Sequence, residues 1–118
     1  MNTFTEQAIK VIVSVPAGTV LTYGRVALLA GSPGAARQVG WLLNSMSEKY
    51  KLPWHRIINA QGKISLRDPV SSYEQKMLLE DEGIEFINDD TISLKKYLWD
   101  VEFIEFDQID LKGFEVVR

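Results

Sequence analysis

The sequence has 118 residues, of which 46% are hydrophobic and 25% charged, the composition of one compact globular domain. No apolar run approaches the roughly 20 residues that span a bilayer; with no cysteine and one histidine we expect no metal site, and no motif indicates a cofactor. The net charge is −3, and the first residues lack the basic region of a signal peptide, so we expect a cytoplasmic protein.

The first predicted element is a helix over residues 3–15. Its apolar side chains recur near helical spacing, and a capping box formed by Thr3 and Glu6 begins it. The Pro-Ala-Gly sequence at 16–18 ends the helix, and a short extended link at 20–21 follows.

Two further helices are predicted in close succession. Thr22 is a suitable N-cap for a helix that runs to about Ala30. Ser32 then caps a second helix, which has Pro33 at its first position and runs to about Asn44. Two helices joined by so short a turn indicate either a helix-turn-helix or an αα-hairpin used only for packing.

Small side chains surround an arginine at the start of the second of these helices. Arg37 follows a Gly-Ala-Ala run and precedes Gln38 and Gly40. Small residues let another molecule approach the backbone closely, and a long arginine on such a surface suits insertion into a groove. The same small residues would equally permit tight packing between helices.

The middle of the chain is predicted to form a β-hairpin. A polar loop over 45–52 leads to a strand at 55–58, a turn at 59–62 and a returning strand at 63–66.

The last third is predicted to hold two helices and an acidic end. A capping box of Ser71 with Glu74 opens a helix that closes at Gly83, and a short helix is expected over 93–99. Residues 101–107 alternate acids with apolar side chains, a pattern that leaves an edge strand, a docking tail and disorder all open.

Charge is distributed unevenly along the chain. Residues 22–67 hold 7 bases and 1 acid, a charge of +6, whereas residues 68–118 hold 14 acids and 5 bases, a charge of −9. A basic middle segment indicates a surface for a phosphate backbone, unless the two parts differ only by chance.

The segment from Pro53 to Ile57, Pro-Trp-His-Arg-Ile, resembles the Pro-Cys-His-Arg nucleophile motif of the O6-alkylguanine-DNA alkyltransferases. Trp54 stands in the position of the cysteine. Residues 15–23 and 36–40 are similar to the DNA-binding segment of that family. The chain therefore resembles the alkyltransferase-like proteins, the branch in which Trp or Ala replaces the cysteine.

This resemblance implies a mostly α-helical fold with a small β-hairpin, a winged-helix-like domain of the alkyltransferase C-terminal type that contains the helix-turn-helix. Residues 1–100 would be the alkyltransferase-like DNA-binding domain, and 101–118 a C-terminal tail of unknown role. Trp41 and Trp99 carry no such resemblance, and we interpret both as core or interface packing.

The resemblance also implies a function without catalysis. The protein would bind duplex DNA in the minor groove, flip O6-alkylguanine into a pocket and mark it for nucleotide excision repair. An indole offers an N–H donor and an apolar face but no nucleophile, and the chain has no thiol. The expected partners are double-stranded DNA containing O6-alkylguanine and nucleotide excision repair proteins; we expect a monomer without membrane contact.

The site residues follow by position in the family motifs. Arg37 is implied to fill the gap left by the flipped nucleotide, and Tyr23 to help turn the target phosphate. The lesion pocket is predicted to comprise Tyr23, Trp54, His55, Ile64, Ser65, Leu66 and Arg67. The DNA-binding surface is predicted to comprise Tyr23, Ser32, Ala36, Arg37, Gln38, Gly40 and Arg56.

Two of these residues have a second interpretation. His55 has no thiol to activate, so a structural hydrogen bond, to Glu82 as the resemblance implies, is set against contact with the lesion. Arg67 falls where the enzymes carry a pocket tyrosine; it either lies over an aromatic ring or pairs with Asp68.

Two other classes of function remain open at this point. A hydrolase with His55 as its base would remove the alkyl group with turnover, but no motif supplies an activated water. A helix-turn-helix transcription regulator would read the major groove, yet the predicted recognition helix offers few base-reading side chains, mainly Arg37, Gln38 and Asn44.

Overall fold

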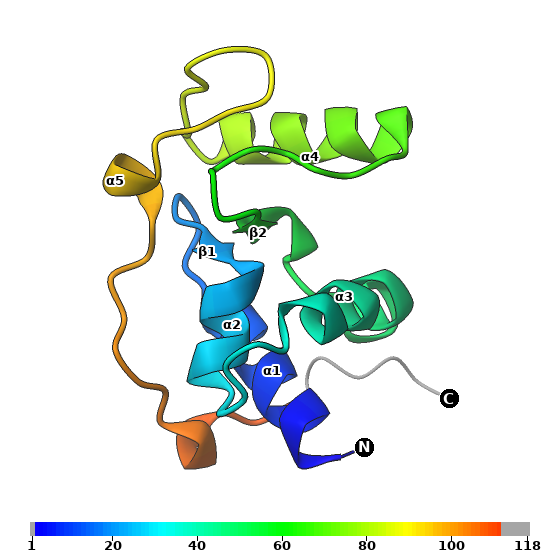
Figure 1. Ribbon diagram of the computed structural model, residues 1–118, viewed down its shortest axis with the longest axis vertical. Coiled ribbons are helices and arrows are strands. Elements are labelled where there is room, and N and C mark those ends of the chain that lie inside the picture. The colour runs from blue at the N-terminus through cyan, green and yellow to red at the C-terminus, as the bar shows by residue number, and fades with distance from the viewer. Residues whose placement is uncertain (1, 112–118) are drawn as a thin grey trace.

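The computed structural model describes residues 2–111 and is mostly helical, as predicted (Figure 1). The helices nearest the N-terminus gather at one end of the molecule, and a later helix crosses the other end. The elements are α1 (Thr3–Ser14), β1 (Leu21–Thr22), α2 (Tyr23–Leu29), α3 (Ala36–Tyr50), η1 (Trp54–Arg56), β2 (Ile57–Ile58), α4 (Pro69–Asp81), α5 (Leu94–Tyr97) and η2 (Phe106–Gln108). Within residues 2–111, no helix is long and apolar enough to cross a membrane.

The helix starts are capped by residues close to those predicted. Thr22 caps α2, where its hydroxyl accepts a hydrogen bond from the backbone N–H of Arg25 at 3.1 Å. Asn2 rather than Thr3 caps α1, and Asp68 rather than Ser71 caps α4. In both corrected cases a side-chain amide or carboxylate oxygen lies before the predicted hydroxyl and accepts a backbone N–H of the first turn.

The third helix differs most from its predicted range. It begins at Ala36 rather than next to Ser32, because Gly34 has a φ of 92° and interrupts any helix that starts earlier. It also runs to Tyr50, through the residues predicted to be a polar loop. Buried Leu43 and Tyr50 lie two turns apart on one face, and their burial maintains the helix past Asn44.

The predicted β-hairpin is wrong. β2 pairs in parallel with β1, with Leu21 opposite Ile57. After β2 the side chain of Asn59 accepts hydrogen bonds from two backbone N–H groups downstream, at Gln61 and Lys63, and turns the chain away. Lys63 then forms an antiparallel bridge far along the chain instead of returning to β2.

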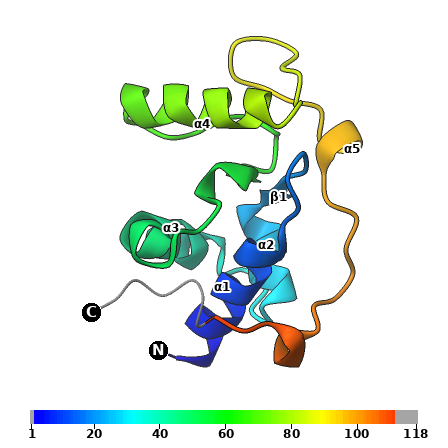
Figure 2. The ribbon, with the colours of Figure 1, turned by 180° about the vertical axis from the view of Figure 1, so that it is seen from behind.

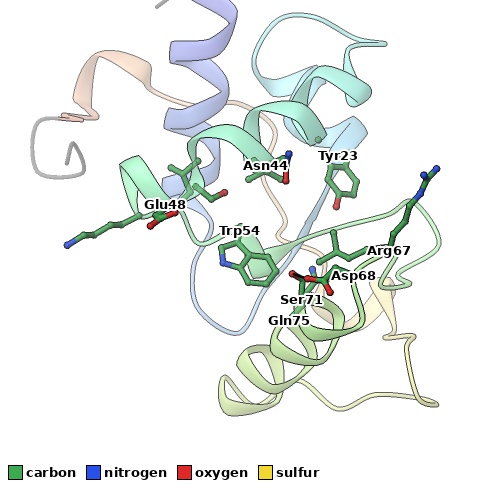
Figure 3. A pocket seen from close by; sticks show the side chains of 14 residues that line it. Tyr23, Asn44, Glu48, Trp54, Arg67, Asp68, Ser71 and Gln75 are labelled. Atoms are coloured by element: carbon green, nitrogen blue, oxygen red, sulfur yellow. Dashed lines mark hydrogen bonds between the residues drawn. The ribbon is translucent and has the colours of Figure 1, made fainter. Parts of the chain in front are cut away.

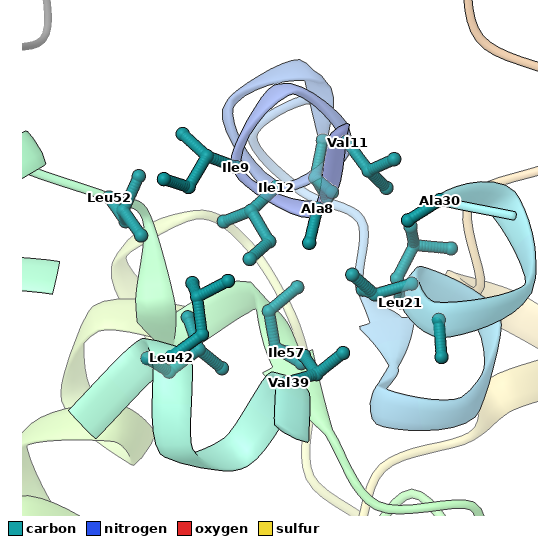
Figure 4. Close-up of a cluster of buried hydrophobic side chains, with 14 of the residues drawn as sticks. Ala8, Ile9, Val11, Ile12, Leu21, Ala30, Val39, Leu42, Leu52 and Ile57 are labelled. Carbon is teal, nitrogen blue, oxygen red and sulfur yellow. The ribbon is translucent and has the colours of Figure 1, made fainter. Parts of the chain in front are cut away.

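Two apolar clusters hold these elements together. The larger lies between α1, α2 and α3 and includes Ile12, Leu42 and Ile57 (Figure 4). The smaller packs Ile58 of β2 against Leu79 of α4. Since β2 contributes one residue to each cluster, the short motif before it is held between them.

The described part of the C-terminal segment is a docked extension. Val101, Ile104 and Phe106 pack on the larger cluster, and the segment runs beside α2 and α1 (Figure 2). Arg25 donates from Nη2 to the Val101 carbonyl at 2.9 Å, and Lys10 donates from Nζ to the Phe106 carbonyl at 3.2 Å. The predicted tail continues to residue 118, and its last seven residues lie outside the described residues.

Candidate nucleic-acid interface

A pocket of about 970 Å³ lies between α3 and the start of α4, beside the Pro-Trp-His-Arg motif (Figure 3). Trp54 presents its indole to this pocket because η1 begins there, directly after Pro53. The lining residues are Tyr23, Gly40, Leu43, Asn44, Ser47, Glu48, Lys51, Leu52, Trp54, Leu66, Arg67, Asp68, Ser71 and Gln75.

Four residues of the predicted lesion pocket line this space. They come from α2, from η1 and from the loop before α4, segments far apart in the chain: Tyr23, Trp54, Leu66 and Arg67. Arg67 is exposed and extends outward from the rim in Figure 3. The alternative pairing of Arg67 with Asp68 is absent from the described salt bridges, and Asp68 instead caps α4.

Three other residues predicted for the pocket lie outside its lining. Ile64 is buried in the smaller apolar cluster. Ser65 is exposed and hydrogen-bonds to the Tyr23 phenol. His55 meets the Trp54 ring edge-on at 6.3 Å between ring centroids and directs its Nε2 toward Glu82.

One wall of the pocket was not predicted from the sequence. Asn44, Ser47, Glu48 and Lys51 line it because α3 continues through the predicted loop. The apolar spacing from Leu43 to Tyr50 is the signal that would have indicated this longer helix.

Gln75 is a further pocket residue that the sequence did not predict. Its side chain is buried, and Nε2 donates to the carbonyl oxygens of His55 and Ile57 at 3.1 and 2.9 Å. These bonds tie α4 to the backbone that follows Trp54. Gln75 lies four residues before buried Leu79, which places both on the inner face of α4.

Glu82, at the end of α4, connects the motif to the loop after α1. Its carboxylate accepts hydrogen bonds from His55 Nε2 at 2.7 Å and from Arg56 Nη2 at 2.7 Å. It also accepts the backbone N–H of Gly18 at 3.0 Å, while Arg56 Nη1 donates to the Val15 carbonyl at 2.9 Å. The predicted His55–Glu82 hydrogen bond is therefore present.

The same contacts define the charge state of Glu82. Burial by itself would raise the pKa of its carboxyl group, but hydrogen bonds from Arg56, His55 and the Gly18 N–H lower that pKa to about 2. Because an ionised carboxylate can only accept, His55 Nε2 carries a proton in this bond. The Arg56 guanidinium, predicted to bind DNA, is here occupied by contacts within the protein.

Tyr23 remains an uncharged hydrogen-bond donor at the pocket wall. Burial raises the pKa of its phenol, and the hydrogen bond with Ser65 only partly opposes this effect. A neutral hydroxyl can donate to a phosphate oxygen without electrostatic repulsion.

The exposed side of α3 carries the predicted DNA-binding residues. Arg37 and Gln38 are exposed, Ala36 and Gly40 are half-buried, and Ser32 lies half-buried in the turn before the helix. Arg37 forms no salt bridge among the described residues.

Trp41 and Trp99, both interpreted from the sequence as core or interface residues, differ in their burial. Trp41 on α3 is 65% exposed, so it is not a core residue. Trp99 is half-buried and packs against the larger cluster.

No group of three or more metal-binding side chains occurs among residues 2–111. In the Pro-Trp-His-Arg motif, Trp54 lines the pocket, whereas His55 and Arg56 contact Glu82.

Comparisons with known proteins find similar sequences over most of the chain. Residues 3–84 match the family model described as the DNA-binding domain of 6-O-methylguanine DNA methyltransferase. A DNA base-flipping protein of Vibrio parahaemolyticus is 48% identical over 99 residues, which are 84% of this chain and 98% of that protein. Alkyltransferase-like protein 1 of Schizosaccharomyces pombe is 36% identical over 104 residues, covering 84% of this chain and 96% of that protein.

A solved structure is similar to most of this chain. The crystal structure of the S. pombe alkyltransferase-like protein in complex with damaged DNA containing O6-carboxymethylguanine superposes with a TM-score of 0.78 at 35% identity, over 86% of this chain and 98% of that one.

Proposed function

The chain belongs to the alkyltransferase-like branch of the O6-alkylguanine-DNA alkyltransferase family, and from this premise we propose that it binds damaged duplex DNA and flips the damaged nucleotide out of the helix. The flipped nucleotide is O6-alkylguanine, and the pocket beside Trp54 receives it without removing the alkyl group. The observation that supports this proposal most is the place of Trp54: it belongs to the Pro-Trp-His-Arg motif, which resembles the nucleophile motif of the family, and it lines a pocket of about 970 Å³.

The chemistry of that position favours binding over transfer. Alkyl transfer requires a thiolate or another activated nucleophile, and the chain contains no cysteine. The indole face of Trp54 instead offers a surface on which a purine can stack, a contact that contributes roughly 1–3 kcal/mol per base. The Glu82 contacts then position the motif rather than activate it.

The start of α3 supports close approach to DNA. A Cβ added at Gly40 would meet no other part of the protein within 4 Å, so packing inside the protein does not require glycine there. Glycine within a helix is nevertheless about 1 kcal/mol less favourable than alanine. Close contact with another molecule accounts for this choice, and exposed Arg37 lies one turn before it.

Extrusion of this nucleotide is energetically reasonable. An alkylated guanine pairs poorly, and unstacking therefore costs less than for a normal base. Arg37 occupies the space that the base leaves, with the helix-turn-helix placed in the minor groove. The charge of +6 over residues 22–67, from 7 bases and 1 acid, favours the phosphate backbone. The bound lesion is passed to nucleotide excision repair proteins.

The proposal is tested by binding and by analysis of the recovered DNA. The protein is expected to bind a duplex with one O6-methylguanine roughly tenfold more tightly than the matched guanine duplex, at one stated salt concentration. Mass spectrometry of the recovered duplex should find the adduct intact. Incision by purified nucleotide excision repair proteins should increase when the chain is added.

Two results would contradict this assignment. Loss of the alkyl group from the DNA would mean that the protein is an enzyme. Equal affinity for both duplexes, combined with preference for one base sequence, would instead favour a helix-turn-helix transcription regulator.

Replacing Trp54 with cysteine is expected not to create an efficient alkyltransferase. A nucleophile needs activating neighbours as well as sulfur, and even a small misplacement against the alkyl carbon is costly. His55 is not among the residues that line the pocket, and its Nε2 is held by Glu82 at 2.7 Å. Incubation of Trp54→Cys with duplex carrying labelled O6-methylguanine should leave almost no label on the protein. Transfer as fast as that of a true alkyltransferase assayed in parallel would refute this expectation.

A further inference from the structure

Trp41 presents a large apolar side chain to solvent on α3. Its side chain is 65% exposed, and it belongs to neither apolar cluster of the described residues. It also lies outside the pocket lining. Within residues 2–111, neither apolar cluster and no part of this pocket accounts for the presence of the indole.

The position of Trp41 on α3 connects it with Arg37. Residues four apart lie on the same face of a helix, and both side chains are exposed. Gly40 and Asn44, which flank Trp41 along α3, line the pocket. Trp41 thus lies on the outer edge of the surface that contains both the arginine and the pocket mouth.

Helix geometry relates this position to duplex DNA. At about 1.5 Å of rise per residue, Trp41 lies about 6 Å farther along α3 than Arg37. Successive nucleotides of one strand are about 3.4 Å apart along a duplex. With α3 running along one strand, Trp41 lies one to two nucleotides from the position that Arg37 occupies.

We infer that Trp41 is a duplex-DNA contact, which packs its indole on the deoxyribose groups of the nucleotides next to the extruded one. This inference rests on the proposed function, because it requires Arg37 to face the extruded position. The deoxyribose ring presents apolar carbon to the indole face, and the indole N–H can donate to a neighbouring oxygen of the backbone.

The contact has a specific energetic character. It removes apolar surface from water and neutralises no phosphate, so it contributes affinity that does not depend on salt. It touches nucleotides beside the lesion rather than the lesion itself. Its contribution is therefore equal for damaged and undamaged duplexes, unlike that of Trp54 in the pocket.

The test compares the full chain with its Trp41→Ala variant on two duplexes, one with guanine and one with O6-methylguanine. Affinity for both is expected to fall roughly tenfold, the effect of removing about 1.4 kcal/mol of contact. The ratio of the two affinities and the slope of log affinity against log salt should remain unchanged. Trp41→Phe, which keeps an aromatic face, should recover most of the loss.

Tyr73→Ala provides a matched control. Tyr73 is 66% exposed and lies on α4, on the side away from the pocket-lining Ser71 and Gln75. This variant should bind both duplexes as the unchanged protein does. The thermal midpoint of Trp41→Ala should also stay close to that of the unchanged chain, because the side chain is exposed.

Three outcomes would overturn the inference. Unchanged DNA affinity of Trp41→Ala would show that Trp41 does not contact the duplex. A loss of affinity for the alkylated duplex alone would mean that Trp41 takes part in lesion recognition instead. Loss of a dimer by Trp41→Ala with unchanged DNA binding would make the indole a contact between copies. Failure of the proposed function would give a different result. The unchanged protein would then bind both duplexes equally, while the effect of Trp41→Ala on affinity for the guanine duplex could still be measured.

Discussion

Replacing Arg37 with alanine is expected to weaken binding to an O6-methylguanine duplex by roughly 1–3 kcal/mol, about 5- to 150-fold. The reason is that the space left by the extruded nucleotide is then unfilled. The extruded base can return to the stack more easily, and the flipped state is less stable. Arg37 is exposed and makes no salt bridge among the described residues, so the thermal midpoint should hardly change. Fluorescence anisotropy and thermal melting measure the two quantities.

Two control variants separate shape from charge for Arg37. Arg37→Lys keeps the positive charge but not the planar guanidinium, and it should recover only part of the affinity. Lys95→Ala removes an exposed charge from α5 and should have little effect. Unchanged lesion affinity in Arg37→Ala would refute the role, and a large loss of stability would make Arg37 a structural residue.

Replacing Glu82 with alanine is expected to lower the free energy of unfolding by roughly 3 kcal/mol, because it leaves charged or polar donors without their acceptor. The carboxylate is only 15% exposed and accepts from His55, Arg56 and the Gly18 N–H. The thermal midpoint should fall by roughly 10 °C. Preference for alkylated duplex should fall as well, since these contacts hold the backbone next to Trp54.

The pH dependence of stability gives an independent measurement of the same contacts. The folded pKa of Glu82, about 2, lies below the ordinary value of 4.5. The stabilisation is therefore fully present above pH 4.5 and is lost as the pH falls toward 2, because the unfolded chain takes up the proton first. Glu82→Ala should lack this part of the acid loss in a series of thermal melts.

The matched control for Glu82 lies two residues earlier. Glu80→Ala removes an exposed carboxylate from the same helix, and its stability and pH profile should resemble those of the unchanged protein. If Glu82→Ala is as stable as Glu80→Ala at pH 7, the hydrogen bonds around Glu82 do not hold the motif in place.

The sequence by itself determined the features that depend on neighbouring residues. The capping of α2 by Thr22 and the succession of two helices separated by a turn after Gly31 follow from residues close together in the chain. The Pro-Trp-His-Arg motif that contains Trp54 and the absence of any cysteine follow from the residues alone. The His55–Glu82 hydrogen bond was predicted from the resemblance to the family.

The tertiary structure decided the features that depend on distant partners. Arg56 was predicted to face DNA, but Glu82 and the Val15 carbonyl occupy its guanidinium. β2, the strand after the motif, has its partner in β1, more than thirty residues earlier, so local hairpin signals at Asn59 indicated the wrong pairing.

The pocket wall and the exposed indole have the same origin. α3 continues past Asn44 because the side chain of Tyr50 is buried, and this extension places Lys51 at the pocket. Trp41 stays exposed because the apolar face of α3 is already filled by Leu42 and Leu43. Period and composition report which side chains are apolar, whereas burial depends on which surfaces meet after the chain has folded.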